Sequence, residues 1–174
     1  MKDNDAPVVP FKYKPGPDRL KVFFTTHLNR IYCAKTHLVS RLPEIESNAN
    51  FQDLQLAIAE TKEVVKNQIA KMQEIYTLLD EDIAIEAFKG MTGLIDDAFT
   101  AIQQHSNDPW LRDMSILFYL QNIENLEVAS FQALQIAAVK LKNKDIERLL
   151  KENFNSAKAD RSLLLMLSAK YILG

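Results

Sequence analysis

Two glutamates three residues apart, Glu124 and Glu127, have the types and spacing most suggestive of chemistry in this sequence. On a helix this spacing places both carboxylates on one face. The same face would carry apolar residues on both sides of the pair, namely Leu117, Leu120, Phe131 and Leu134. A carboxylate that points into a core must be paired or protonated, because an isolated buried charge is very costly. Three interpretations follow: a metal site, a structural pair satisfied by other side chains, or a helix whose phase leaves one glutamate exposed. The structural pair is favoured, because a metal ion needs more ligands than two.

The elements that must position these carboxylates are long helices, because apolar residues recur at spacings of three and four along most of the chain. We expect helices over about 18–47, 51–79, 108–142 and 143–174, and a shorter helical region over 83–105 that is interrupted at Gly90 and Gly93. Pro43 should kink the first helix or end its regular part. The expected N-caps are Asp18, Asn50, Asp108 and Asn143. No segment alternates with the two-residue period of a strand, so no sheet is predicted.

The predicted fold class is all-α. Four helices of this length would each be about 40 Å long, and their apolar stripes are best buried in an antiparallel four-helix bundle. The shorter segment would lie in the connection between the second and third long helices. Residues 18–174 would form this single domain, and residues 1–17, which hold four of the six prolines, would form an extended N-terminal arm.

The predicted stripe of the first helix is Leu20, Phe24, Leu28, Ile31, Lys35, Leu38, Leu42 and Ile45, and that of the last helix is Ile146, Leu150, Phe154, Ala157, Arg161, Leu164, Ser168 and Tyr171. Each long helix carries a polar or small residue near the middle of its stripe, and these are Lys35, Thr61, the Glu124–Glu127 pair and Ala157. Ferritin-like di-metal proteins place a glutamate on two helices and Glu-x-x-His on the other two at such positions. The chain has three histidines, and the residue three positions before each is Phe24, Ala34 or Ile102. Glu-x-x-His is therefore missing, and a di-metal cage is not expected.

Five stretches between about Leu20 and Leu167 resemble the ferritin-like stress proteins of the YciE/YciF type. They are FFTTHLNRIYCAKTHLVSRLPEI, IYTLL, GMTGLIDD, LRDMSILFYLQNIENLEVASF and LLKENFNSAKADRSLLL. The resemblance implies a ferritin-like bundle that often pairs into dimers, a proposed metal site and an association with stress responses.

The resemblance also implies which positions once held metal ligands. The family usually has IYxAExQ where this chain has IYCAKTH, so the glutamate of that motif is Lys35 here. The family's histidine of the second helix falls on Thr61, and its paired glutamates of the last helix fall on Ser156 and Ala157. Only Glu124 and Glu127 match acidic family positions. These six residues are thus the expected vestigial site, with no metal, cofactor or catalytic residue.

The function expected from this pattern is a non-enzymatic, ferritin-like structural or interaction protein, related to stress, that has lost its di-metal site. The alternative is a ferritin-like metalloprotein with an unusual residual metal site at Glu124 and Glu127. In the first case Lys35 would supply the positive charge that the two carboxylates need, and Arg161 is a second candidate cation.

Composition excludes several other classes. The 21 basic and 23 acidic residues are interspersed and give a net charge of −2, so a nucleic-acid partner is not expected. The longest apolar run, LLLML at 163–167, is far shorter than a membrane span. Its apolar side chains surround the helix axis, which agrees with a homodimer, and a further protein partner would be unknown. One cysteine, Cys33, and an N-terminus without the features of a signal peptide favour the cytoplasm.

Overall fold

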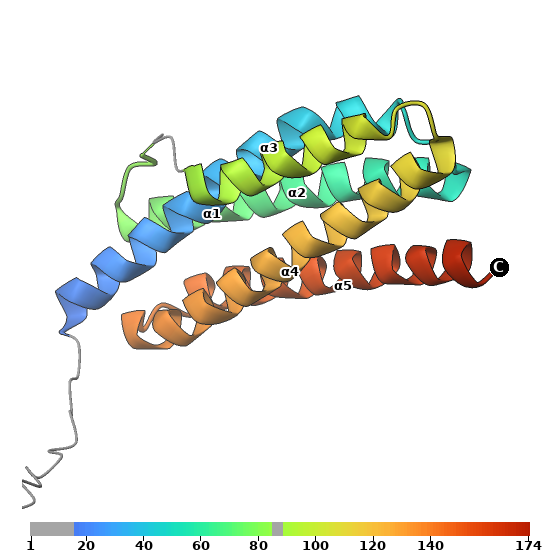
Figure 1. Ribbon diagram of the computed structural model, residues 1–174. Coiled ribbons are helices and arrows are strands. Elements are labelled where there is room, and N and C mark those ends of the chain that lie inside the picture. The colour runs from blue at the N-terminus through green and yellow to red at the C-terminus, as the bar shows by residue number, and fades with distance from the viewer. Residues whose placement is uncertain (1–15, 85–88) are drawn as a thin grey trace, which may run out of the picture.

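The computed structural model describes residues 16–84 and 89–174, and this part of the chain folds into five helices without a strand (Figure 1). They are α1 (Pro17–Glu46), α2 (Gln52–Leu79), α3 (Lys89–Gln104), α4 (Pro109–Leu141) and α5 (Lys144–Leu173). The predicted all-α class is therefore confirmed. The predicted arm lies outside the described residues except for Gly16 and Pro17, and Pro17 is already the first residue of α1.

Two of the four predicted N-caps are confirmed by their hydrogen bonds. Asp108 accepts from the backbone N–H of Leu111 at 3.0 Å, and Asn143 accepts from those of Asp145 and Ile146 at 3.0 and 3.2 Å. These side chains satisfy N–H groups that have no partner within the helix.

The other two predicted caps are wrong. The N-cap of α1 is Gly16 rather than Asp18, because Pro17 takes the first helical position, which suits a residue without an N–H. The N-cap of α2 is Phe51, and no side chain of its own caps that helix. Instead, Asp113 of α4 accepts from the backbone N–H groups of Asn50 and Phe51 at 2.7 and 2.6 Å.

The helix-breaking residues lie inside their helices and do not end them. Pro43 does not end α1, which continues to Glu46. Gly90 and Gly93 both lie inside α3, so the predicted interruption of that helix is wrong. A β-carbon at either glycine would meet nothing within 4 Å, and the helix accepts them at the modest cost that glycine carries.

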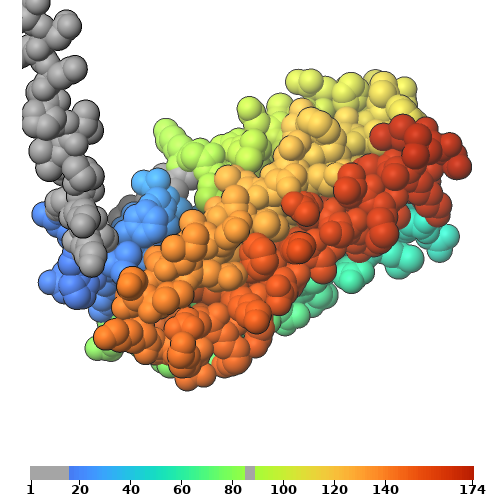
Figure 2. Space-filling view, turned by 90° about the horizontal axis from the view of Figure 1, so that it is seen from below, coloured from blue at the N-terminus to red at the C-terminus, as the bar shows by residue number. Residues whose placement is uncertain are grey.

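The long helices pack so that α1 contacts α2 and α4, and α5 contacts the same two helices. The shorter α3 packs on α1 and α4. Figure 2 shows α4 and α5 side by side along one face of the elongated molecule. Among the described helices, none is apolar over a length sufficient to cross a membrane.

The core consists of two hydrophobic clusters that share all four long helices. The first cluster also includes α3, and its members include Leu38, Leu42, Ile58, Phe99, Leu117 and Leu164. Members of the second cluster include Phe24, Leu28, Met72, Phe131, Leu134 and Leu150. Each long helix therefore passes from one cluster to the other near its middle, and that crossing point is where the polar residues lie.

Candidate functional site

A layer of buried polar side chains lies between the two hydrophobic clusters, and we call it the polar layer. Its members are Lys35 of α1, Thr61 of α2, Glu124 and Glu127 of α4, and Asp160 of α5. All five are at least 96% buried, with Lys35 and Thr61 fully enclosed. Three carboxyl groups thus share the interior with one amine, so ionisation of all three would leave an excess of negative charge there.

Lys35 reaches the layer because it occupies the stripe of α1 between Ile31 of one cluster and Leu38 of the other. Its Nζ forms an ion pair and a hydrogen bond with Oε2 of Glu127. The ammonium also lies 5.5 Å from the ring centroid of Phe131, within the range of a cation–π contact. The predicted partnership of Lys35 with the glutamates is therefore present at Glu127.

Glu124 has a different environment, although it belongs to the same turn of α4. Its Oε2 is buried and has no hydrogen-bond partner among the described residues. Burial raises the pKa of Glu124 well above its ordinary value, the negative charge of Glu127 raises it further, and Lys35 opposes both effects. The carboxyl group therefore favours its protonated form, in which burial costs less.

Asp160 is the member that the sequence did not predict. Its Oδ1 accepts a hydrogen bond from Thr61 Oγ1 at 3.0 Å, while its Oδ2 has no partner in the described chain. Burial raises the pKa of Asp160 from 3.8 to about 6, although the Thr61 hydroxyl favours the ionised form. The proposed stripe of the last helix passed from Ala157 to Arg161, whereas the buried residues run through Asn153, Ala157, Asp160 and Leu164.

Arg161, the second candidate cation, does not enter the layer. Its Nη1 donates to Asn125 Oδ1 at 3.1 Å in an exposed contact between α5 and α4. The spacing of three and four from Ile146 through Asp160 could have shown the correct face. The apolar pattern did not identify that face, because two of its residues, Asn153 and Asp160, are polar.

The remaining two predicted positions, Ser156 and Ala157, contribute nothing polar to the layer. Ala157 is buried in the second hydrophobic cluster. The Ser156 hydroxyl accepts from Gln68 Nε2 at 2.8 Å and donates to the backbone oxygen of Asn153 at 3.0 Å. The buried Gln68–Asn153 pair is a separate contact of α2 with α5.

The donor set of the polar layer does not fit the di-metal centre that the fold family implies. Within the described chain, no group of three or more His, Cys, Asp or Glu side chains is placed to hold a metal ion. An ammonium already neutralises Glu127, and a hydroxyl already binds Asp160. The layer also lacks a histidine, which ferritin-like di-metal sites use on two helices.

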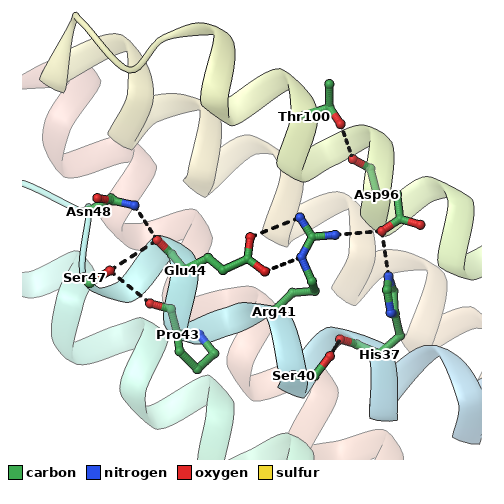
Figure 3. Close-up of polar contacts among 9 residues, drawn as sticks. All are labelled: His37, Ser40, Arg41, Pro43, Glu44, Ser47, Asn48, Asp96 and Thr100. Carbon is green, nitrogen blue, oxygen red and sulfur yellow. Dashed lines mark hydrogen bonds and ion pairs between the residues drawn. The ribbon is translucent and has the colours of Figure 1, made fainter.

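One of the three histidines has a structural role at the surface instead (Figure 3). His37 Nε2 and Arg41 Nη1 of α1 lie 2.7 and 2.8 Å from the same Asp96 oxygen of α3. Arg41 also pairs with Glu44 and lies over the ring of Phe99, 4.5 Å from its centroid. These contacts attach α3 to α1.

Comparison with known proteins agrees with this fold. A family model described as a domain of unknown function (DUF892) matches residues 19–172. The E. coli stress protein YciF has a TM-score of 0.82 and 23% identity, over 88% of this chain and 96% of its own. YcfI from Rhodopseudomonas palustris, described as a candidate structural protein, has a TM-score of 0.79 and 23% identity, over 90% and 97%. At this identity the likeness concerns the fold alone. Comparison with curated protein sequences gives no match.

Proposed function

This chain belongs to the DUF892 family, as its predicted YciE/YciF resemblance indicated, and we propose that it is a non-enzymatic structural or interaction protein without a metal site. In this proposal α1, α2, α4 and α5 form a ferritin-like, antiparallel four-helix bundle, and α3 is an addition in the connection between α2 and α4. The six vestigial positions keep the bundle folded and no longer bind a metal ion.

The observation that supports this proposal is the buried ion pair between Lys35 and Glu127. A metal ion would neutralise the carboxylates with its own charge. Here Lys35 supplies one positive charge, and protonation of Glu124, whose pKa burial raises well above its ordinary value, removes a second negative charge. Asp160, whose pKa is raised to about 6, is protonated only below that pH and accepts a hydrogen bond from the Thr61 hydroxyl. Adding a divalent cation next to the Lys35 ammonium would be opposed by repulsion between like charges.

A second function has one observation in its favour. Glu124 Oε2 and Asp160 Oδ2 are buried acceptors without a hydrogen-bond partner in the described chain. Orphaned oxygen atoms of this kind suit a small cation that displaces the proton of Glu124. The alternative is therefore the metalloprotein with a residual site at Glu124 and Glu127. Asp160 could complete such a site only if these side chains move, because no three acidic side chains of the described chain are placed to hold a metal ion.

Thermal unfolding with added metal separates the two functions. A ligand that binds only the native state raises the unfolding midpoint. The proposed function predicts the same midpoint with EDTA as with manganese(II), zinc(II) or anaerobic iron(II). The alternative predicts a rise with one of these ions that disappears in Glu124→Gln and persists in the exposed control Glu63→Gln.

The setting of the protein is part of the same proposal. A single cysteine, Cys33, supports a reducing compartment such as the cytoplasm. A role under stress is supported by the description of its E. coli neighbour as a stress protein. The proposed first partner is a second copy of this chain, which would cover the apolar side chains that α4 and α5 expose.

A further inference from the structure

A pocket of about 800 Å³ opens between α1, α3 and α4, outside the polar layer. Its apolar lining includes Phe23 and Ile31 of α1, Met91 of α3, and Leu126 and Leu134 of α4. The volume lies within the range of pockets that bind small molecules, about 300–1,000 Å³, and those pockets are also mostly apolar. No member of the polar layer lines it, so its chemistry is separate from that of Lys35.

Small residues create this space. On α4, Ala129 and Ala133 are four positions apart and therefore project from the same face, with Ser130 beside them. On α3, Gly90 also lines the pocket, and a β-carbon there would meet nothing within 4 Å. Ala129 and Ala133 are exposed and line the pocket, so a larger side chain at either position would extend into it.

The ionisable side chains that line the pocket in the described chain are all basic. His27 and Arg30 of α1 and Lys89 of α3 line it, and no described lining residue is acidic. Arg30 and Lys89 therefore bring positive charge to this border of the pocket. Lys89, Gly90 and Met91 form the first turn of α3, whose positive helix-dipole end adds to the same potential.

From the apolar wall and the basic border together, we propose that this pocket binds a single-chain amphiphile with an anionic head group. The alkyl chain lies along Phe23, Leu126 and Leu134, and the carboxylate or phosphate head lies near Arg30 and Lys89. Charge complementarity selects the anionic head, and burial of the chain supplies the affinity. This activity is independent of the metal-free state proposed above.

Isothermal titration calorimetry on the full chain tests the proposal, with each amphiphile kept below its micelle concentration. Dodecanoate and dodecyl phosphate are the two probes, and their relative affinities tell which anionic head is preferred. Acetate and inorganic phosphate test the head alone, and dodecyltrimethylammonium tests the same chain with a cationic head. We expect one-to-one binding of at least one anionic amphiphile, and binding weaker by about tenfold or more for the cationic one.

Variants locate the binding. Ala133→Phe should weaken binding by about tenfold or more because its ring occupies the pocket, whereas the exposed control Ala159→Phe on α5 should not. Lys89→Gln combined with Arg30→Gln should reduce the preference for the anionic head over the cationic one. Circular dichroism melting curves check that each variant is folded before its titration.

Three results would overturn the proposal. Equal affinity for anionic and cationic amphiphiles would remove the role of Arg30 and Lys89. Unchanged binding in a folded Ala133→Phe variant would place the ligand elsewhere. Absence of binding below the micelle concentration, with binding only to dodecanoate micelles or anionic lipid vesicles, would show a surface that contacts membranes rather than a ligand pocket.

Discussion

The contribution of Lys35 to stability depends on the buried carboxylates around it. A buried ion pair need not stabilise a protein more than apolar residues of similar size, because both charges lose their hydration. Removing one member is different, since the other charge then remains in the interior without a counter-ion. The Lys35–Glu127 pair therefore matters mainly through the cost of leaving Glu127 alone.

Replacement of the lysine measures that cost. Lys35→Met should lower the free energy of unfolding by about 3–5 kcal/mol, the usual loss when one side of a buried pair is removed. Adding Glu124→Gln and Glu127→Gln should restore a large part of this loss, because the uncompensated carboxylates are then absent. Urea denaturation of the three proteins gives both quantities.

The matched control is Lys66→Met, which removes an exposed partner of Glu63. That change should stay within about 0.5 kcal/mol of the parent protein, as most surface substitutions do. If Lys35→Met also costs no more than this, then its ammonium does not compensate the carboxylates and the interpretation is wrong.

Asp160 makes the stability depend on pH. The pKa of Asp160 rises from 3.8 to about 6 on folding. As the pH rises, the unfolded chain therefore releases this proton at a lower pH than the native state does, and the unfolding free energy falls over the interval between the two pKa values. The stabilisation is complete below about pH 4 and is lost as the pH rises through about 6. The variant Asp160→Asn cannot ionise at this position and so does not lose this stabilisation. The unfolding free energy of the variant, relative to that of the parent protein, should therefore rise by up to about 3 kcal/mol between pH 4 and pH 7.

Urea denaturation at several pH values checks this, with Asp53→Asn as a control of opposite sign. A hydrogen bond from Lys170 and its charge lower the pKa of Asp53, so that folding favours its ionised form. The unfolding free energy of Asp53→Asn, relative to that of the parent protein, should therefore fall as the pH rises. A constant difference between Asp160→Asn and the parent over the whole range would show that Asp160 titrates normally in the fold.

At the scale of the elements, the start of α2 depends on a residue of α4. Asp113 is fully buried, and its Oδ2 accepts the backbone N–H groups of Asn50 and Phe51. The carboxylate therefore joins the turn between α1 and α2 to the first part of α4. Its other oxygen, Oδ1, lies 3.8 Å from the Arg112 guanidinium.

Asp113→Ala should lower the unfolding free energy by about 1–3 kcal/mol, because two backbone donors lose a charged acceptor in a buried position. Asn50→Ala, at the position that the sequence favoured as the cap, should change it by no more than about 0.5 kcal/mol. If the two substitutions lower the unfolding free energy equally in chemical denaturation, then Asn50 rather than Asp113 caps α2.

The sequence predicted the helices well, and it also predicted which faces of α1 and α4 are buried. Both faces could be found because their apolar stripes are continuous. On α1, the expected stripe from Phe24 through Lys35 to Ile45 is buried. On α4, the apolar residues around Glu124 and Glu127 are buried with them. Local spacing determines these faces, so periodicity alone is sufficient to find them.

The same reasoning failed where a face is polar or a contact is distant in sequence. On α5, the buried Asn153 and Asp160 interrupt the apolar pattern, and the predicted stripe passed through Arg161 instead. The bonds from Asp113 to Asn50 and Phe51 connect residues more than 60 positions apart, so no local pattern shows them. The residues of the polar layer on α1, α2 and α4 were thus singled out from the sequence, whereas its α5 residue, Asp160, required the structure.

For the whole molecule, the exposed apolar side chains support the proposed homodimer. The LLLML run buries Leu164 and Leu167 and exposes Leu165 and Met166 by 58% and 64%. On α4, the exposed apolar side chains include Phe118, Ile136 and Val139. α4 and α5 lie side by side (Figure 2), and in the proposed homodimer a second copy would cover these exposed side chains.

Sedimentation equilibrium at micromolar concentration should therefore give the mass of a dimer. Leu165→Lys combined with Met166→Lys should shift it to a monomer while the helical circular dichroism spectrum stays unchanged, because both side chains are exposed in the single chain. A monomeric mass for the unmodified protein would contradict the homodimer.

The central claim is that Lys35 and a proton on Glu124, rather than a metal ion, offset the charges of the two carboxylates that α4 places in the polar layer. Elemental analysis tests it most directly, on full-length protein produced in medium supplemented with iron, manganese and zinc and purified without chelator. The prediction is far less than one metal ion per chain for all three elements, in a protein that is folded by circular dichroism. One iron, manganese or zinc ion per chain, reduced by Glu124→Gln but not by the exposed control Glu63→Gln, would contradict the claim.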